Sequence, residues 1–290
     1  MRKILRYFYM KAYSYLHRTP LGVFLSTLSF SSFLKRWLKA DKVVLDGHTI
    51  YVDELDSLRL TFEGKYEPFE SEIVEKTLRE GDVVLDVGAN IGCYTLIAAK
   101  AVGSKGRVYA FEPDPNNFAL LKRNIEVNNY HNVTPIQKAV TDKTGTLKLY
   151  VSDRSKGDHR IFNSYDGRES IEIEAIKLDD YFINKEKRID FIKMDIQGAE
   201  ANALKGMTGL IQHNDSLTLT TEFAPALLEL MGTQPRDYLE LLVSLGFQLK
   251  DIDETRRQVN VVSVSEVLAI FDSAKKNDTN LLCVKSNKSG

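Results

Sequence analysis

Residues 81–103 carry the stretch that decides the fold, GDVVLDVGANIGCYTLIAAKAVG. Within it, Asp82–Val87 is a short apolar run flanked by glycines, which predicts a buried strand. Ile91–Val102 follows with the apolar spacing of a helix and stops at Gly103. A buried strand, a glycine-containing turn and a helix in this order begin a doubly wound sheet.

The rest of the chain continues this alternation, which implies a mostly parallel sheet. Gly145–Val151 and Ile171–Ile176 instead alternate apolar and polar residues, which predicts an inserted antiparallel pair. We therefore expect an α/β fold: a doubly wound, mostly parallel, seven-stranded Rossmann-like sheet with this inserted pair and an N-terminal helical extension. The other expected elements are strands at Arg107–Phe111, Val133–Val140, Ile189–Met194, Leu217–Phe223, Gly246–Asp251 and Leu281–Val284, and helices at Asp114–Asn128, from about Gly198, and at Asp237–Leu245.

Composition limits the class of protein. The chain has 290 residues, 39 Lys and Arg against 40 Asp and Glu, and 43% hydrophobic residues. This length suffices for a large buried core, and the net charge of −1 argues against a general nucleic-acid binder. Two cysteines are too few for a disulfide scaffold or for a zinc site built from cysteine alone. We expect a cytoplasmic globular protein that binds no nucleic acid.

Residues 1–40 break the even balance of charge. They contain eight Lys or Arg, no acidic residue and nine aromatic residues. Two interpretations stay open: a helical cap packed on the main domain, or a helix in peripheral contact with the inner face of an anionic membrane. Serines and threonines within residues 21–34 argue against a signal peptide or a spanning helix. We expect an N-terminal extension over residues 1–50 and the main domain over residues 51–290.

The turn after the first strand is expected to bind a ligand, because ligands of such sheets sit at the carboxyl ends of the strands. Its spacing, Gly88-x-x-x-Gly92, departs from the G-x-G-x-x-G of dinucleotide sites, and Asp86 is poorly placed beside a diphosphate. Glu112 ends the second strand, where a carboxylate can accept both hydroxyls of a ribose. S-adenosylmethionine has a ribose, an amino group and a sulfonium but no phosphate, so electrostatics favours it over NAD.

Five segments then follow one another in a characteristic order. They are GKYEP at 64–68, GDVVLDVGANIG at 81–92, FEP at 111–113, KAV at 138–140 followed by Gly145, and IKMDIQGAE at 192–200. Together they cover roughly residues 60–225 and resemble the FkbM family of class I S-adenosylmethionine-dependent methyltransferases. FkbM-like enzymes are typically O-methyltransferases that act on hydroxyls of sugars or other natural products.

The resemblance implies S-adenosylmethionine as cofactor and a small-molecule, glycan or glycolipid acceptor as partner. Gln197 stands where the family commonly has Glu in D-x-E-G, and we do not assign it as a base. The residues implied to bind the cofactor are Asp86, Gly88, Asn90 and Gly92 for the methionine part, Glu112 for the ribose, and Ala139 near the adenine.

Methyl transfer to a hydroxyl is helped by a positioned base that takes the proton of the alcohol. Asp195, at the end of a strand beside the expected crevice, is the first candidate; its alternatives are a helix N-cap or a hydrogen bond to Lys193. His159 is the second candidate, because imidazole titrates near neutrality. The loop that contains His159 could also be merely solvated.

Four further residues are expected on the acceptor side, each with a structural alternative. Arg160 would hold an anionic or polyhydroxylated acceptor, unless its loop is simply solvated. Glu200 would bind acceptor hydroxyls or favour the positive end of its helix. Glu222 would bind the acceptor or end its strand, and Tyr66 would close over the site or pack as an aromatic.

No metal site is expected, because the five histidines are scattered along the chain. The carboxylates of Asp195, Glu200 and Glu222 could hold Mg²⁺, but a sugar site does not require it. Two other functions stay open beside the methyltransferase: an NAD-dependent oxidoreductase on a related fold, and a membrane-surface binding module whose cofactor pocket is vestigial.

Overall fold

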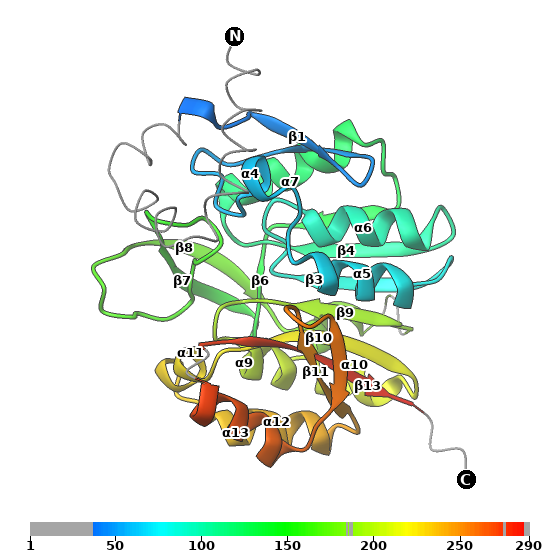
Figure 1. Cartoon of the computed structure of the whole chain (residues 1–290), viewed down its shortest axis with the longest axis vertical. Helices are drawn as coiled ribbons and strands as arrows, with labels where there is room; N and C mark the ends of the chain where they lie inside the picture. Colours follow the sequence, from blue (N-terminus) through cyan, green and yellow to red (C-terminus); the bar gives the residue numbers. More distant parts are fainter. Residues whose placement is uncertain (1–36, 184, 186–187, 275–276, 287–290) are drawn as a thin grey trace. The chain divides into compact units, whose positions relative to one another are not determined.

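The computed structural model describes residues 37–183, 185, 188–274 and 277–286 (Figure 1). The chain divides into two compact units, Met1–Tyr66 and Glu67–Gly290, and each is described by itself. Residue 50, where the sequence predicts the domain boundary, lies inside the first unit in strand β2 (His48–Tyr51). The predictions of a cap or membrane helix concern mainly residues 1–36, which lie outside the described residues. Within the described residues, no helix combines the length and the apolar character that crossing a membrane requires.

The first unit contains a β-hairpin and a short helix. Strand β1 (Lys42–Leu45) pairs antiparallel with β2. Asp46 and Gly47 between them have φ angles of 50° and 88°, the left-handed conformation that two-residue hairpin turns favour. Helix α4 (Leu60–Glu63) follows and ends at Gly64.

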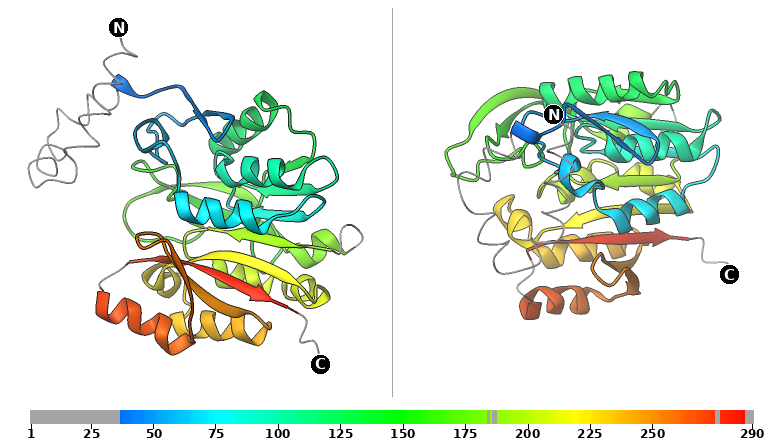
Figure 2. Two further views of the ribbon diagram at one scale, coloured as in Figure 1. Left: turned by 45° about the vertical axis from the view of Figure 1, so that its right-hand side comes forward. Right: turned by 45° about the horizontal axis from the view of Figure 1, so that its top comes forward.

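The second unit is built on a large sheet of eight strands in the described part of the chain. The strand order is β12-β11-β13-β10-β9-β3-β4-β5, and neighbours from β10 to β5 pair in parallel (Figures 1 and 2). Strand β13 runs antiparallel to both of its neighbours. The strands are β3 (Val83–Val87), β4 (Arg107–Phe111), β5 (Val133–Ile136), β9 (Phe191–Met194), β10 (Leu217–Phe223), β11 (Gln248–Asp253), β12 (Gln258–Val261) and β13 (Thr279–Lys285).

Helices cover both faces of this sheet, which confirms the doubly wound α/β fold. Alternate residues of β3 and β4 face a core shared with helices α8, α9, α10 and α12. Helices α5, α6 and α7 lie against the other face. The helices are α5 (Pro68–Thr77), α6 (Cys93–Val102), α7 (Pro115–Val127), α8 (Leu178–Phe182), α9 (Glu200–Lys205), α10 (Thr208–His213), α11 (Pro225–Leu230), α12 (Pro235–Ser244) and α13 (Val264–Ala274).

The structure differs from the expected elements in several places. The end of the expected helical extension, up to residue 50, contains strand β1 and most of strand β2, and helices α4, α5, α8, α10, α11 and α13 were not expected. The strand predicted at Val133–Val140 is split, because the chain turns tightly at a hydrogen bond from Lys138 N to Ile136 O. Its second part, β6 (Ala139–Val140), joins the predicted pair β7 (Gly145–Val151) and β8 (Glu169–Ile176) in a second sheet. In the large sheet, β12 adds an eighth strand at the edge beside β11.

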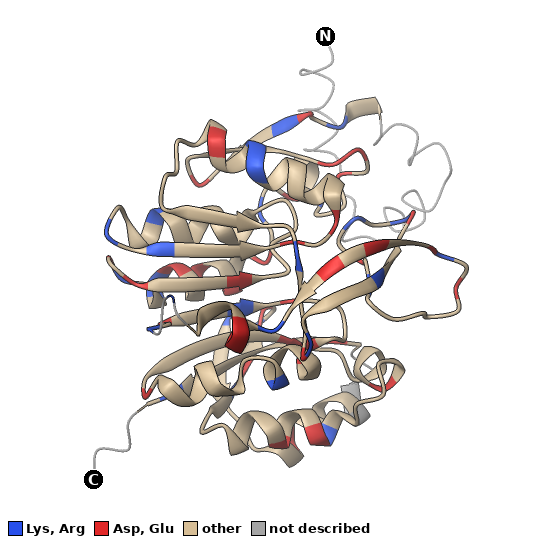
Figure 3. Cartoon of the chain, turned by 180° about the vertical axis from the view of Figure 1, so that it is seen from behind, with Lys and Arg blue, Asp and Glu red and all other residues tan. Residues whose placement is uncertain are grey.

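Charged residues are spread along this framework. Figure 3 shows Lys and Arg interspersed with Asp and Glu over the described elements, in keeping with the near-zero net charge.

The carboxyl ends of β3, β4 and β9 meet at one edge of the sheet, and the residues singled out in the sequence follow these ends.

Candidate active site

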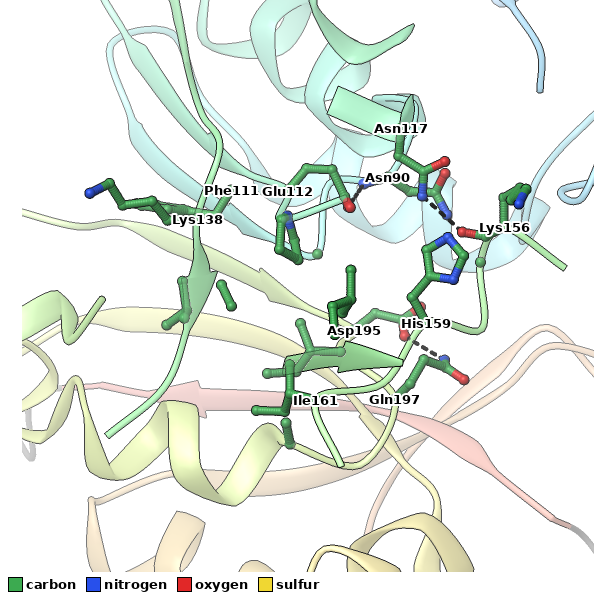
Figure 4. A pocket seen from close by; sticks show the side chains of 18 residues that line it. Asn90, Phe111, Glu112, Asn117, Lys138, Lys156, His159, Ile161, Asp195 and Gln197 are labelled. Atoms are coloured by element: carbon green, nitrogen blue, oxygen red, sulfur yellow. Dashed lines mark hydrogen bonds between the residues drawn. The ribbon is translucent and has the colours of Figure 1, made fainter. Parts of the chain in front are cut away.

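A pocket lies at the carboxyl ends of β3, β4 and β9 (Figure 4). Apolar residues line part of it, including Phe111 from the large sheet, Val140 from the second sheet and Ile196 from the turn after β9. The structure thus brings together residues that were predicted from separate motifs. Six predicted site residues are among its lining: Gly88, Asn90, Glu112, Ala139, His159 and Asp195.

The turn after β3 approaches the end of β9 closely at Gly88. Gly88 has a φ of +85°, and its backbone N donates to the Phe111 carbonyl at 3.0 Å. A Cβ at position 88 would stand 1.9 Å from the carbonyl oxygen of Asp195. Only glycine meets both conditions, because it tolerates positive φ and has no Cβ. Glycine at this position therefore sets the candidate cofactor loop directly beside the candidate base.

Glu112 holds this turn through backbone hydrogen bonds. Its Oε2 accepts from Asn90 N at 2.8 Å and its Oε1 accepts from Asp114 N at 2.9 Å. Burial raises the pKa of Glu112 to about 8, although both backbone donors favour the charged form. A carboxylate has about four acceptor positions, so each oxygen keeps capacity for a further donor from the pocket that Glu112 lines. These two acceptor oxygens fit a ribose, whose two neighbouring hydroxyls can donate to them.

His159 enters the pocket as a hydrogen-bond donor. Its Nδ1 accepts from Ser152 N at 3.0 Å, which leaves the proton of the neutral ring on Nε2. The buried Nε2 lies 3.9 Å from Asp114 Oδ2. Burial lowers the pKa of His159 and favours the neutral ring. The only basic lone pair is thus occupied by a backbone N–H, and this geometry argues against the predicted role of His159 as a base.

Asp195 follows β9 directly, and its backbone N donates to Val87 O at 3.0 Å. Its Oδ1 accepts from Gln197 Nε2 at 3.0 Å, and the same nitrogen lies 3.1 Å from Glu222 Oε2. The side chain of Asp195 is only partly buried and lines the pocket. Asp195 therefore has the access to a bound molecule that a base requires.

A buried ion pair lies behind the site. Lys193 Nζ is 3.4 Å from Glu70 Oε1, and the side chains are 3% and 1% exposed. Lys193 also lies over the ring of Tyr94, 4.8 Å from its centre. Burial opposes the charge on Lys193, but the carboxylates around it outweigh this effect and raise its pKa above the usual value. Lys193 therefore pairs with Glu70, whereas the sequence had suggested Asp195 as its partner.

The other predicted site residues are outside the lining of this pocket. Asp86 is buried and accepts from Thr95 Oγ1, and burial raises its pKa to about 6. Glu200 is buried, and its Oε1 accepts from Ile196 N and Gly198 N. Gly92 is the N-cap of α6, and Tyr66 belongs to the first unit. Arg160 pairs with Asp158 at 2.8 Å. Glu222 accepts a hydrogen bond from Gln197.

Asn117 and Lys156 are two of the pocket residues that the sequence did not assign to the site. Asn117 Nδ2 donates to the carbonyl of Lys156 at 2.8 Å, which ties the loop after β7 to α7 across the pocket (Figure 4). The Asp-Pro start of α7 marked the helix but did not indicate that Asn117 lines the pocket. For Lys156 we find no signal in the sequence. Among the residues that the structure describes, no three His, Cys, Asp or Glu side chains are arranged to hold a metal ion together.

Comparisons with known proteins address the identity of this site. The family model described as the methyltransferase FkbM domain matches residues 86–249. The hexuronic acid methyltransferase AglP of Haloferax volcanii is 29% identical over 165 residues, covering 56% of this chain and 62% of the relative. Methyltransferase 1 of Beauveria bassiana is 26% identical over 147 residues, covering 43% of this chain and 57% of the relative. The matches thus span about three fifths of the length of these relatives.

Among solved structures, the crystal structure of methyltransferase FkbM from Methylobacillus flagellatus KT is similar, with a TM-score of 0.43 and 18% identity. The similarity covers 79% of this chain and 53% of that chain. The family model spans more than half of the chain and includes the pocket residues from Gly88 to Gln197. The chain belongs to the FkbM methyltransferase family, whose methyl donor is S-adenosylmethionine.

Proposed function

We propose that this chain is an O-methyltransferase that transfers the methyl group of S-adenosylmethionine to a hydroxyl of a sugar, a glycan or a related natural product. The observation that carries the proposal is that Asp195, a partly exposed carboxylate, lines the same pocket as Glu112 and Asn90. The name of the Haloferax relative, a hexuronic acid methyltransferase, supports a sugar as acceptor.

The cofactor residues are assigned by their hydrogen-bonding capacity. Glu112 would accept the ribose hydroxyls, because its two backbone bonds leave acceptor positions free. Ala139 and Phe111 would provide apolar contacts for the adenine ring of the cofactor. Asn117 and Lys156, joined across the pocket, would cover the bound cofactor and exclude water.

When bound, S-adenosylmethionine supplies an activated methyl group, whose bond electrons leave with the sulfur as S-adenosylhomocysteine. The protein then has to hold the acceptor oxygen in line with this methyl group and take its proton. Asp195 would accept that proton on its carboxylate while the new oxygen–carbon bond forms, and would release it to solvent afterwards. His159 would act as a donor that fixes the loop or the ligand.

The first experiment is a screen for the acceptor with the full chain. S-adenosylmethionine and a panel of sugars, glycans and lipid-linked sugars are supplied, and mass spectrometry detects the gain of one methyl group. We expect the methyl group on an oxygen. A methyl group on nitrogen or carbon, or none on any acceptor, would contradict the proposal.

Asp195→Asn tests the base in the same assay. We expect turnover to fall by roughly 10²–10⁴-fold, with little change in the calorimetric affinity for S-adenosylhomocysteine. Asp215→Asn is the matched control, because Asp215 is exposed after α10. Unchanged turnover in Asp195→Asn would remove this residue as the base. NAD serves as the control ligand in calorimetry, since binding of NAD in place of S-adenosylhomocysteine would support an oxidoreductase.

A further inference from the structure

One side-chain amide joins the two partly exposed carboxylates at the ends of β9 and β10. Nε2 of Gln197 donates to Asp195 Oδ1 at 3.0 Å and to Glu222 Oε2 at 3.1 Å. An amide nitrogen carries two hydrogens, one for each carboxylate. The first of the two bonds is drawn in Figure 4, where Gln197 lies beside Asp195 in the pocket lining.

The backbone around Gln197 is held from both sides. Oε1 of the buried Glu200 accepts from Ile196 N at 3.0 Å and from Gly198 N at 3.2 Å. Gln197 itself has a φ of 55°, and a Cβ at Gly198 would stand 2.8 Å from Leu227. These contacts hold the backbone of the loop, and the hydrogen bonds to Asp195 and Glu222 hold the Gln197 amide itself. This gives Glu200 a role in shaping the loop rather than in contacting the acceptor.

The amide also reduces the repulsion between the two carboxylates. Asp195 and Glu222 share one donor, and two ionised carboxylates this close repel each other unless a donor lies between them. Burial and the neighbouring carboxylate of Asp195 raise the pKa of Glu222 well above its usual value. A glutamate at position 197 would replace the shared donor with a third acid, whereas glutamine lets both carboxylates turn toward one group.

We propose that Gln197 is a positioning residue for methyl transfer, whose amide holds the carboxylates of Asp195 and Glu222 side by side and aims Asp195 at the acceptor hydroxyl. This inference rests on the proposed O-methyltransferase function. Gln197 itself carries no charge and does not act as the base.

The test compares Gln197→Ala and Gln197→Glu with the wild-type chain. In Gln197→Ala we expect kcat to fall by about 10²-fold, the order of loss that a misplaced catalytic group causes. The affinity for S-adenosylhomocysteine should stay within about twofold of wild type, because the amide of Gln197 bonds to Asp195 and Glu222 and not to the residues assigned to the cofactor. Gln212→Ala is the control, since Gln212 is exposed on α10 and outside the site.

A pH profile separates positioning from a general loss of structure. In Gln197→Glu the added negative charge disfavours ionised neighbours, so the pH of half-maximal kcat should rise. Gln197→Glu with Glu222→Gln restores a donor between positions 197 and 222 and should bring this midpoint back toward wild type. A purely structural loss would lower kcat without moving the midpoint.

The outcomes are distinct. Unchanged kcat in Gln197→Ala, an unmoved midpoint in Gln197→Glu, or a parallel loss of cofactor affinity would each overturn the inference while leaving the proposed function standing. Failure of the wild-type chain itself to methylate any hydroxyl acceptor overturns the proposed function first, and the inference with it. Circular dichroism and thermal unfolding of each variant identify any variant that does not fold.

Discussion

The backbone of Gly88 contacts the carbonyl group of Asp195 so closely that a Cβ at position 88 would stand 1.9 Å from the carbonyl oxygen. Asp195 N in turn donates to Val87 O at 3.0 Å, so the two strand ends are hydrogen-bonded at this point. The contact places the loop that would hold the cofactor against the backbone of Asp195, the residue whose carboxylate would receive the acceptor proton.

Gly88→Ala should disrupt this contact. We expect a loss of about 2–5 kcal/mol in the free energy of unfolding, the sum of a strained positive φ and an overpacked site, together with loss of cofactor binding. Gly232→Ala is the matched control, because Gly232 has a φ of +87° and a Cβ added there would meet no atom within 4 Å. Urea denaturation and calorimetry measure both effects. Equal destabilisation in the two variants would show that the contact with Asp195 contributes nothing.

Cofactor affinity should depend on pH through Glu112. The pKa of about 8 means that Glu112 is largely protonated below this pH, whereas ribose hydroxyls donate to the charged form. The affinity for S-adenosylhomocysteine should therefore rise with pH up to about 8, by at most about tenfold per pH unit, and then level off. Glu112→Gln should weaken binding and remove this slope. A variant that keeps the wild-type slope in calorimetry would assign the slope to another group.

Removing one partner of the buried pair of Lys193 and Glu70 should lower the free energy of unfolding strongly. Replacing both partners with apolar residues should lower it much less. Lys193→Met leaves a buried carboxylate without its partner, and we expect a loss of about 3–5 kcal/mol in unfolding free energy. The double variant Lys193→Met with Glu70→Leu should recover most of this loss. Lys76→Met is the control, since Lys76 pairs with Glu72 on the surface with 74% of its side chain exposed, and should cost under about 1 kcal/mol. Additive losses in the double variant would contradict this account.

Asn117 should retain the bound cofactor through its bond to the Lys156 carbonyl. Asn117→Ala removes one hydrogen bond between α7 and the loop after β7, worth about 1 kcal/mol. We expect roughly fivefold weaker binding of S-adenosylhomocysteine, mainly from faster dissociation. Asn116→Ala tests the neighbouring residue, whose side chain is exposed. Equal dissociation rates in stopped-flow measurements on both variants would leave the loop without a role in retention.

Buried parallel strands were predicted within a few residues, because such strands appear in the sequence as short apolar runs between turns. Strand β10 was predicted with its observed bounds, Leu217–Phe223. The elements that the sequence did not predict are strands β1, β2 and β12 and helices α4, α5, α8, α10, α11 and α13. The split of the third strand was also missed, because β6 leaves the large sheet to pair with β8, whose residues lie far along the chain.

Some of the predicted site residues line the pocket, and others do not. Gly88, Glu112 and Asp195 were found because the carboxyl ends of parallel strands meet at one edge, so their place along the chain predicts their place in space. Glu200 and Asp86 were assigned to the site as well, but their carboxylates are buried and bond to the protein itself. Chain position indicates which strand end a side chain follows, but not the direction in which it points.

The amino-acid sequence alone determined the doubly wound sheet, the glycine turn and the row of acidic residues at the strand ends, because these follow from local periodicity and chain order. Only the tertiary structure decided which partner each group has. His159 is a donor because Ser152 N occupies its other nitrogen, Lys193 pairs with Glu70 across the fold, and Gln197 bonds two carboxylates from different strands. Hydrogen bonds and charges act over a few ångströms of space, and residues distant in sequence come within that range only once the chain has folded.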